Sequence, residues 1–198
     1  MKNAITTINK LANQFSKLPG VGFKSAQRFA YKIVDMPKSQ VDELIAAIED
    51  AKNNVKYCEV CGNFTDSSPC EACKHATDLK TICVVKEPKD VLTIEKIKDY
   101  KGGFHVLHGT ISPLDGRGPD DIRIKELLAR ISKNNVEEVV LALNPDVEGE
   151  ATSMYITKLL KPLDVKISKL AKGLSMGTDI DYADELTLSE AFANRKYL

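Results

Sequence analysis

The spacing of apolar residues predicts a helical first part of the chain. In residues 4–18 apolar side chains, Ile5 among them, recur every three or four positions, as on one face of an amphipathic helix. A Pro-Gly-Val-Gly run interrupts this pattern, and a second helix is expected over residues 24–34. A proline ends that pattern in turn, and Ser39 is expected to cap a third helix. Residues 1–56 are therefore predicted to form a small helical region.

A different pattern begins near residue 81, where short apolar runs alternate with amphipathic segments. Continuous apolar runs of this length indicate strands whose two faces are both buried. Such runs occupy residues 81–85, 104–107, 138–143 and 165–170. Helices are expected at 89–98, after a cap at Asp120, at 150–160, and at 186–193. Because strands alternate with helices, we expect βαβ units, a parallel sheet and a multi-part α/β fold.

Between these two parts lies a short segment, residues 57–77, that is rich in cysteine and poor in large aliphatic residues. Its cysteines follow a C-x2-C-x8-C-x2-C spacing and are Cys58, Cys61, Cys70 and Cys73. Two close pairs of thiolates suit one tetrahedral zinc ion, and four sulfur ligands leave no position for a reactive water. We therefore expect one structural zinc ion per chain, with two disulfides or free thiols as the alternative.

Three further residues of this region have expected roles. Gly62 follows the first cysteine pair, where a metal-binding knuckle needs a tight turn. His75 could replace one cysteine as a ligand but is expected to be solvated, and Cys83 is expected to be a small core residue.

The break between the first two predicted helices carries candidate nucleic-acid ligands. Gly20 and Gly22 permit backbone conformations that leave amide groups facing outward, and the start of the next helix adds free N–H groups. Lys24 and Arg28, one helical turn apart, can reach neighbouring phosphates. Such a contact would read the DNA backbone and not its sequence. The alternative is an ordinary turn between two helices.

Charge changes this picture only locally. The chain has 28 basic and 28 acidic residues, so its net charge gives no indication of a nucleic-acid partner. Residues 1–35, however, hold six basic side chains, Lys2 among them, against the single acid Asp35, which suits either a DNA contact or a solvated helix surface. No apolar run approaches the roughly 20 residues of a membrane span, and the first residues lack the apolar core of a signal peptide. A cytoplasmic protein is therefore expected.

Acidic residues follow the third predicted strand, where ligands of parallel sheets gather. The run Asn144-Pro145-Asp146-Val147-Glu148-Gly149-Glu150 opens the next helix, and Glu87 follows the first strand. Clustered carboxylates there can hold Mg²⁺ for phosphoryl-transfer chemistry. Two other interpretations stay open, because acids at a helix start interact favourably with its dipole, and because an acidic patch can dock a basic partner.

Taken in order, these motifs resemble the RecR family of bacterial recombination mediators over nearly the whole chain. The matching segments are Leu18-Pro19-Gly20-Val21-Gly22, Lys24-Ser25-Ala26-Gln27-Arg28, the four cysteines, Ile82-Cys83-Val84-Val85, Gly109-x-Ile111-Ser112-Pro113-Leu114 and the run from Asn144 to Thr152. Lys172-Gly173 and Gly177-Thr178 depart from the family's usual His-Gly and Gly-Gly.

The resemblance implies a domain order and a role. It implies a helix-hairpin-helix region at 1–56, a zinc finger at 57–77, a Toprim domain at 81–175 and a C-terminal segment at 176–198. It further implies no catalytic residues, DNA binding by Lys24 and Arg28, and action with RecO and RecF to load RecA at gaps coated by single-strand binding protein. Dimers or tetrameric rings that encircle DNA are also implied, and the loop with Glu148 and Glu150 is implied to meet RecO.

A metal-dependent nicking enzyme of the Toprim type is the second hypothesis. Asn144-Pro145-Asp146 resembles the Asp-Pro-Asp run of catalytic Toprim enzymes, but its first position is a neutral and weaker ligand for Mg²⁺. Little chain remains for a separate cleavage domain, although single tyrosines such as Tyr155 are present. No P-loop motif for ATP hydrolysis occurs either. The sequence therefore favours the adaptor, and leaves open the preference among duplex, single-stranded and gapped DNA.

Overall fold

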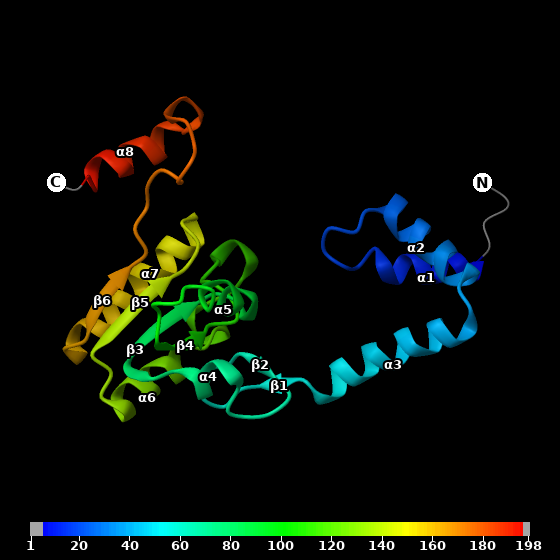
Figure 1. Cartoon of the computed structure of the whole chain (residues 1–198), viewed down its shortest axis with the longest axis horizontal. Helices are drawn as coiled ribbons and strands as arrows, with labels where there is room; N and C mark the ends of the chain where they lie inside the picture. Colours follow the sequence, from blue (N-terminus) through cyan, green and yellow to red (C-terminus); the bar gives the residue numbers. More distant parts are fainter. Residues whose placement is uncertain (1–5, 196–198) are drawn as a thin grey trace. The chain divides into compact units, whose positions relative to one another are not determined.

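The computed structural model of the chain describes residues 6–195, which fall into two compact units that divide after Val55. The expected positions Lys2 and Ile5 lie outside the described residues. Each unit has its own buried core. Figure 1 draws the helices and strands of both units.

The first unit consists of three helices, α1 (Thr6–Phe15), α2 (Phe23–Asp35) and α3 (Lys38–Asn54). Helices α1 and α2 form a hairpin whose buried residues are Ile8, Ala12, Ala26 and Ala30. The small alanine side chains let the two helices approach closely, and the rings of Phe15 and Phe29 meet edge to face at 5.8 Å. Helix α3 buries none of its residues.

The expected cap of the third helix was wrong. Helix α3 begins at Lys38, after Pro37, and Ser39 lies inside its first turn. Pro37 occupies the N-cap position with φ of −54°, and no side chain caps this end of the helix.

The second unit contains a four-stranded parallel sheet in the order β4-β3-β5-β6. The strands are β3 (Asp78–Val85), β4 (Gly102–Val106), β5 (Glu138–Ala142) and β6 (Lys166–Lys169), each within a few residues of its predicted run. The parallel sheet with its helices confirms the expected α/β class. Between the strands lie α5 (Pro88–Ile94), α6 (Ile124–Asn134) and α7 (Val147–Leu160).

The two faces of the sheet are covered differently. Helices α6 and α7 pack on the face formed by residues such as Ile82, Val84 and Leu141. The opposite face, with Cys83 and Val85, packs against α5 and the four-cysteine segment. Cys83 is buried as a small core residue, as expected.

The helix expected after Asp120 begins later than predicted. Asp120 lies in a short 3₁₀ helix, η2 (Pro119–Asp121), and α6 starts at Ile124. The carboxylate of Asp120 pairs instead with Lys125, whose Nζ atom lies 2.9 Å from Oδ1. The 3₁₀ turn inserts a break that apolar spacing alone does not reveal.

The remaining elements are short. A two-stranded antiparallel ribbon, β1 (Lys56–Tyr57) and β2 (Phe64–Thr65), and helix α4 (Glu71–His75) carry the cysteines. Three further 3₁₀ helices are η1 (Pro113–Asp115), η3 (Lys161–Leu163) and η4 (Ile180–Tyr182). Helix α8 (Glu185–Ala193) follows a long connection, with Asp184 as its N-cap. No helix among the described residues has the length and apolar character to cross a membrane.

Candidate metal centre and nucleic-acid interface

The four cysteines form one compact cluster. Their Sγ atoms all lie within 4.8 Å of one another, with Cys58 and Cys73 at 3.9 Å and Cys61 and Cys70 at 3.4 Å. A Zn–S bond of about 2.3 Å sets an S···S edge of roughly 3.8 Å in a regular tetrahedron. The spacing of the sulfur atoms therefore fits a zinc ion held by four thiolates.

Local backbone geometry prepares these thiolates. Gly62 has φ of 77° and makes the tight turn after the first pair, as expected. The N–H of Asn63 donates to Cys61 Sγ and the N–H of Cys70 donates to Cys58 Sγ, each at 3.4 Å. N–H groups that point at sulfur stabilise its charged form, as ligation requires.

The protonation of the cluster also calls for a cation. Burial alone would raise the pKa of Cys58, but hydrogen bonds from the backbone of Cys70, Cys61 and Val60 outweigh it and lower the pKa to about 6. The neighbouring Cys73 thiol, together with burial, holds the pKa of Cys61 far above its usual range. Four thiolates this close repel one another, so they ionise together only around a positive ion.

The expected phosphate-binding turn joins α1 and α2. Gly20 has φ of 80°, a value that favours glycine, and Val21 N–H donates to the Leu18 carbonyl at 3.1 Å. Gly22 is the N-cap of α2, and no side chain caps this end. The first N–H groups of the helix are therefore left for solvent or for an anion.

Two cations stand beside that turn. Lys24 and Arg28 are both exposed, and neither has an acidic partner within residues 6–195. The Cζ atom of Arg28 lies 5.8 Å from the centroid of the Phe29 ring. The turn, the open helix end and two cations without acidic partners lie on one short segment, an arrangement that can hold two neighbouring phosphates.

The acidic run at the end of β5 has mostly structural partners. Asp146 is the N-cap of α7, and its carboxylate accepts the N–H of Gly149 at 2.7 Å. Glu150 is ion-paired with Lys169 and with Lys172, the second at 2.7 Å. Hydrogen bonds from these lysines lower the pKa of Glu150. Asn144 is exposed, and the half-buried Glu148 has no ion pair among the described residues.

Glu87 is also occupied. It is the N-cap of α5, forms a capping box with Asp90, and pairs with Lys89 at 2.6 Å, which lowers its pKa. Within residues 6–195 the four cysteines form the sole group of three or more metal-ligand side chains, and no acidic group joins Glu87 to the β5 loop. The expected gathering of Glu87 with the acidic loop is therefore not seen among the described residues.

Sequence reasoning missed the two lysines that neutralise Glu150. The signal was weak, because Lys166, Lys169 and Lys172 are basic residues at a spacing of three in and after a short strand. Their role depends on β6 pairing with β5, which places Lys169 opposite Leu141.

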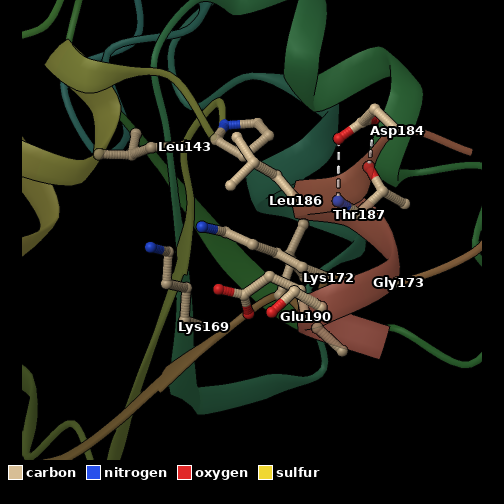
Figure 2. Close-up of a pocket in the computed structure, with 12 residues that line it drawn as sticks. Leu143, Lys169, Lys172, Gly173, Asp184, Leu186, Thr187 and Glu190 are labelled. Carbon is tan, nitrogen blue, oxygen red and sulfur yellow. Dashed lines mark hydrogen bonds between the residues drawn. The ribbon is translucent and has the colours of Figure 1, made fainter. Parts of the chain in front are cut away.

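A cavity of about 710 Å³ lies between this lysine segment and α8 (Figure 2). Lys169 and Lys172 line one side, and Glu190 and Leu186 of α8 line the other. Asp184 is hydrogen-bonded to Thr187 at 2.9 Å (N–H donor) and 2.7 Å (hydroxyl donor). Because Glu150 already pairs both lysines, the cavity is not a strongly cationic site.

Comparison with known proteins places these features in a family context. Family models match residues 8–52 (RecR, helix-hairpin-helix), 55–75 (RecR, four-cysteine zinc finger domain), 80–171 (Toprim domain) and 173–196 (RecR, C-terminal). The protein named "Recombination protein RecR" of Clostridium perfringens strain 13 / Type A is 54% identical over 189 residues, which cover 95% of each chain. Its namesake in C. perfringens strain ATCC 13124 matches to the same extent.

Proposed function

Because the chain belongs to the RecR family of recombination proteins, we propose that it acts in DNA repair as a mediator that binds DNA without cutting it. The observation that carries this proposal is the turn before α2. It combines an uncapped helix start with two exposed cations, Lys24 and Arg28, that lack acidic partners among the described residues. Such a site binds the phosphates of DNA whatever the base sequence, which suits a protein that must act wherever DNA is damaged.

The proposal that the protein is not an enzyme is supported by the acidic loop. Metal-assisted phosphoryl transfer needs carboxylates that are free to hold the ion. Asp146 caps a helix and Glu150 is paired with two lysines, while Glu87 is engaged by Lys89. Asn144 is a neutral ligand. A metal-dependent nicking enzyme is the alternative, and it would have to release these carboxylates from their partners.

The parts of the chain are proposed to divide the work. Residues 1–56 would grip DNA, residues 57–77 would hold one structural zinc ion, residues 81–175 would form the Toprim scaffold, and residues 176–198 would serve as a C-terminal segment. Bound zinc would cross-link the four thiolates and would catalyse no reaction, since sulfur fills all four of its coordination positions.

The proposed partners follow from the family resemblance. We propose that the protein works with RecO and RecF to promote RecA loading at gaps, and that Glu148, which has no ion pair among the described residues, is the part of the acidic loop that meets a basic surface of RecO. Self-association into a dimer or tetrameric ring is also proposed. It is supported by large apolar side chains left exposed on α8, Leu186 at 79% and Phe192 at 75%.

One experiment tests both halves of the proposal. The full-length protein is incubated with gapped, duplex and single-stranded DNA over a salt series with Mg²⁺ or Mn²⁺, and the products are resolved on native and denaturing gels. Intact DNA with steeply salt-dependent binding is expected. If the wild type nicks the DNA and Asp146→Asn or Glu87→Gln does not, the protein is an enzyme instead. Absence of binding at low salt would reject the DNA-binding role.

A further inference from the structure

Three ring side chains meet on the zinc-binding segment, and we call them the ring cluster: Tyr57, Phe64 and His108. Tyr57 and Phe64 are paired across the β1–β2 ribbon, and their rings stack at 5.5 Å between centroids with an interplanar angle of 14°. The His108 ring lies 4.4 Å from that of Tyr57 and 5.9 Å from that of Phe64. Tyr57 is nevertheless 54% exposed and Phe64 53% exposed, so ring surface remains open to solvent.

The ring cluster is held in place from two sides. The Nε2 atom of His108 donates to the carbonyl oxygen of Gly62 at 2.6 Å, which ties the imidazole to the turn after Cys61. His108 lies two residues beyond the end of β4 at Val106 and has φ of 59°. A ring cluster fixed by the metal-binding turn and by the parallel sheet loses little conformational entropy when a flat ligand binds.

Two guanidinium groups flank the ring cluster. The Nη1 atom of Arg117 lies 3.2 Å from the position that a Cβ atom on Gly109, next to His108, would take. The Nε atom of Arg123 lies 3.0 Å from the equivalent position on Gly62. Arg117 has no ion pair within residues 6–195, whereas Arg123 has a single long one, 3.8 Å from Glu126.

The position of Arg117 is set by backbone bonds. Ser112 and Arg117 exchange two backbone hydrogen bonds, at 3.0 and 2.9 Å, and so close a small loop beside the ring cluster. The Nε atom of Arg123 is buried without a hydrogen-bond partner among the described residues. An anion at this place would therefore find one guanidinium without an ion pair and one whose pairing is incomplete.

We propose that the ring cluster with Arg117 and Arg123 is a stacking site for single-stranded DNA. Unpaired bases would lie on the open surface of Tyr57 and Phe64, while the two arginines contact the adjoining phosphates. Duplex DNA does not fit, because its bases are already stacked on one another. The inference rests on the proposed DNA-binding function and adds to it a second contact, separate from the turn before α2, that selects unpaired DNA.

The exposed rings alone would equally suit a protein partner. The flanking guanidinium groups decide for nucleic acid, because a phosphate chain supplies one negative charge for every base that it presents. A protein partner is therefore an outcome of the test and is not proposed.

The test uses the full-length protein and a short oligothymidylate that contains 2-aminopurine, whose fluorescence is quenched when the base stacks. Wild-type protein is expected to quench the probe. Tyr57→Leu and Phe64→Leu keep apolar volume but remove the aromatic face, so the quenching should be lost and affinity should fall about fivefold or more. Tyr57→Phe should behave as the wild type.

Matched controls separate stacking from damage to the fold. Tyr182→Leu removes another exposed aromatic ring, 82% accessible, from the same unit and should change neither affinity nor quenching. Zinc content of each variant is measured, and Phe64→Leu supplies the result should Tyr57→Leu fail to hold zinc. Arg117→Gln should weaken binding of the single strand, while binding of duplex DNA through the turn before α2 should change little.

The outcomes distinguish this inference from the function on which it rests. If wild-type protein binds no DNA at low salt, the proposed function itself fails. If wild-type protein binds, but both leucine variants quench the probe and bind as it does, the stacking site is wrong and the mediator role stands. If the leucine variants bind DNA normally but change the oligomeric state, the rings belong to a contact between copies, and the inference is overturned.

Discussion

The backbone N–H of Val106 donates to the carbonyl oxygen of Cys61 at 2.7 Å, so a cysteine of the metal cluster is bonded directly to an edge strand of the parallel sheet. Cys58, Cys61 and Cys70 are buried in the same apolar cluster as Val85 and Phe104. The metal centre and the core on this face of the sheet therefore share their packing, and the loss of one should be felt by the other.

The first prediction concerns that shared packing. Cys73→Ser should release zinc and lower the free energy of unfolding by roughly 4 kcal/mol, because ion binding is coupled to folding and metal loss is among the largest single effects. Zinc content and urea denaturation measure it. Cys83→Ala, a change at a buried cysteine that is not a metal ligand, should keep its zinc. A Cys73→Ser protein with full zinc and unchanged stability would contradict the assignment.

A second prediction concerns the start of α7. A Cβ atom on Gly149 would collide with the carbonyl oxygen of Asn144, a backbone atom that cannot swing aside. Gly149→Ala should therefore destabilise the protein by about 3 kcal/mol, which a comparison of thermal melting curves would detect. Gly173→Ala is the matched control, since its Cβ would meet Ala191 at 3.9 Å, an ordinary contact. Equal melting temperatures for the two variants would show that the loop adapts.

A third prediction concerns pH. His105 is buried beside the start of α6, and burial lowers its pKa from 6.5 to about 4. The unfolded chain therefore binds a proton at His105 that the folded chain does not. The stability contributed by neutral His105 is fully present above pH 6.5 and is lost as the pH falls from 6.5 to about 4. Between about pH 7 and pH 5 the wild type should lose about 2 kcal/mol more than His105→Gln, measured by urea denaturation.

The glutamine variant is chosen because its amide can still donate to the Arg123 carbonyl, which His105 contacts through Nε2 at 2.8 Å. Zinc content must be equal in both proteins at both pH values, because protonated thiols release metal. Parallel pH profiles for the two proteins would mean that another group carries the acid sensitivity.

A fourth prediction concerns the turn before α2. Lys24→Ala with Arg28→Ala should weaken DNA binding and reduce the slope of log affinity against log salt concentration by roughly 2, because two phosphate contacts are lost. Lys32→Ala with Lys52→Ala removes the same charge from exposed positions farther along α2 and α3 and should leave the slope nearly unchanged. The same slope in both double variants would refute the assignment of the turn.

The sequence predicted those parts of the site whose partners are near in the chain. The cysteine cluster follows from a local spacing, and the left-handed turn at Gly62 follows from its place after the first pair. Asp146 and Glu150 were identified as site residues, but their partners were not. Glu150 pairs with Lys169 and Lys172 because β6 lies beside β5, and sheet order is fixed by packing across the whole domain.

The errors in helix starts have a similar origin. Ser39 and Asp120 are good capping residues by type. Pro37, however, precedes α3, and a 3₁₀ turn precedes α6. Capping preferences describe an isolated helix end, whereas the surrounding chain decides where that end falls. The side chains around the zinc-binding segment, His108 and Arg123 among them, gave no signal at all, because their contacts with that segment span tens of residues.

The bond between Val106 and Cys61 also closes part of the outer edge of β4 with a segment that metal holds in shape. Open strand edges recruit other chains and start aggregation, and proteins commonly shield them with a loop or a charge. In this protein the segment covers the edge only while it holds its zinc ion. In a zinc-poor culture this chain should therefore accumulate in insoluble form, and its yield should follow the metal content of the medium.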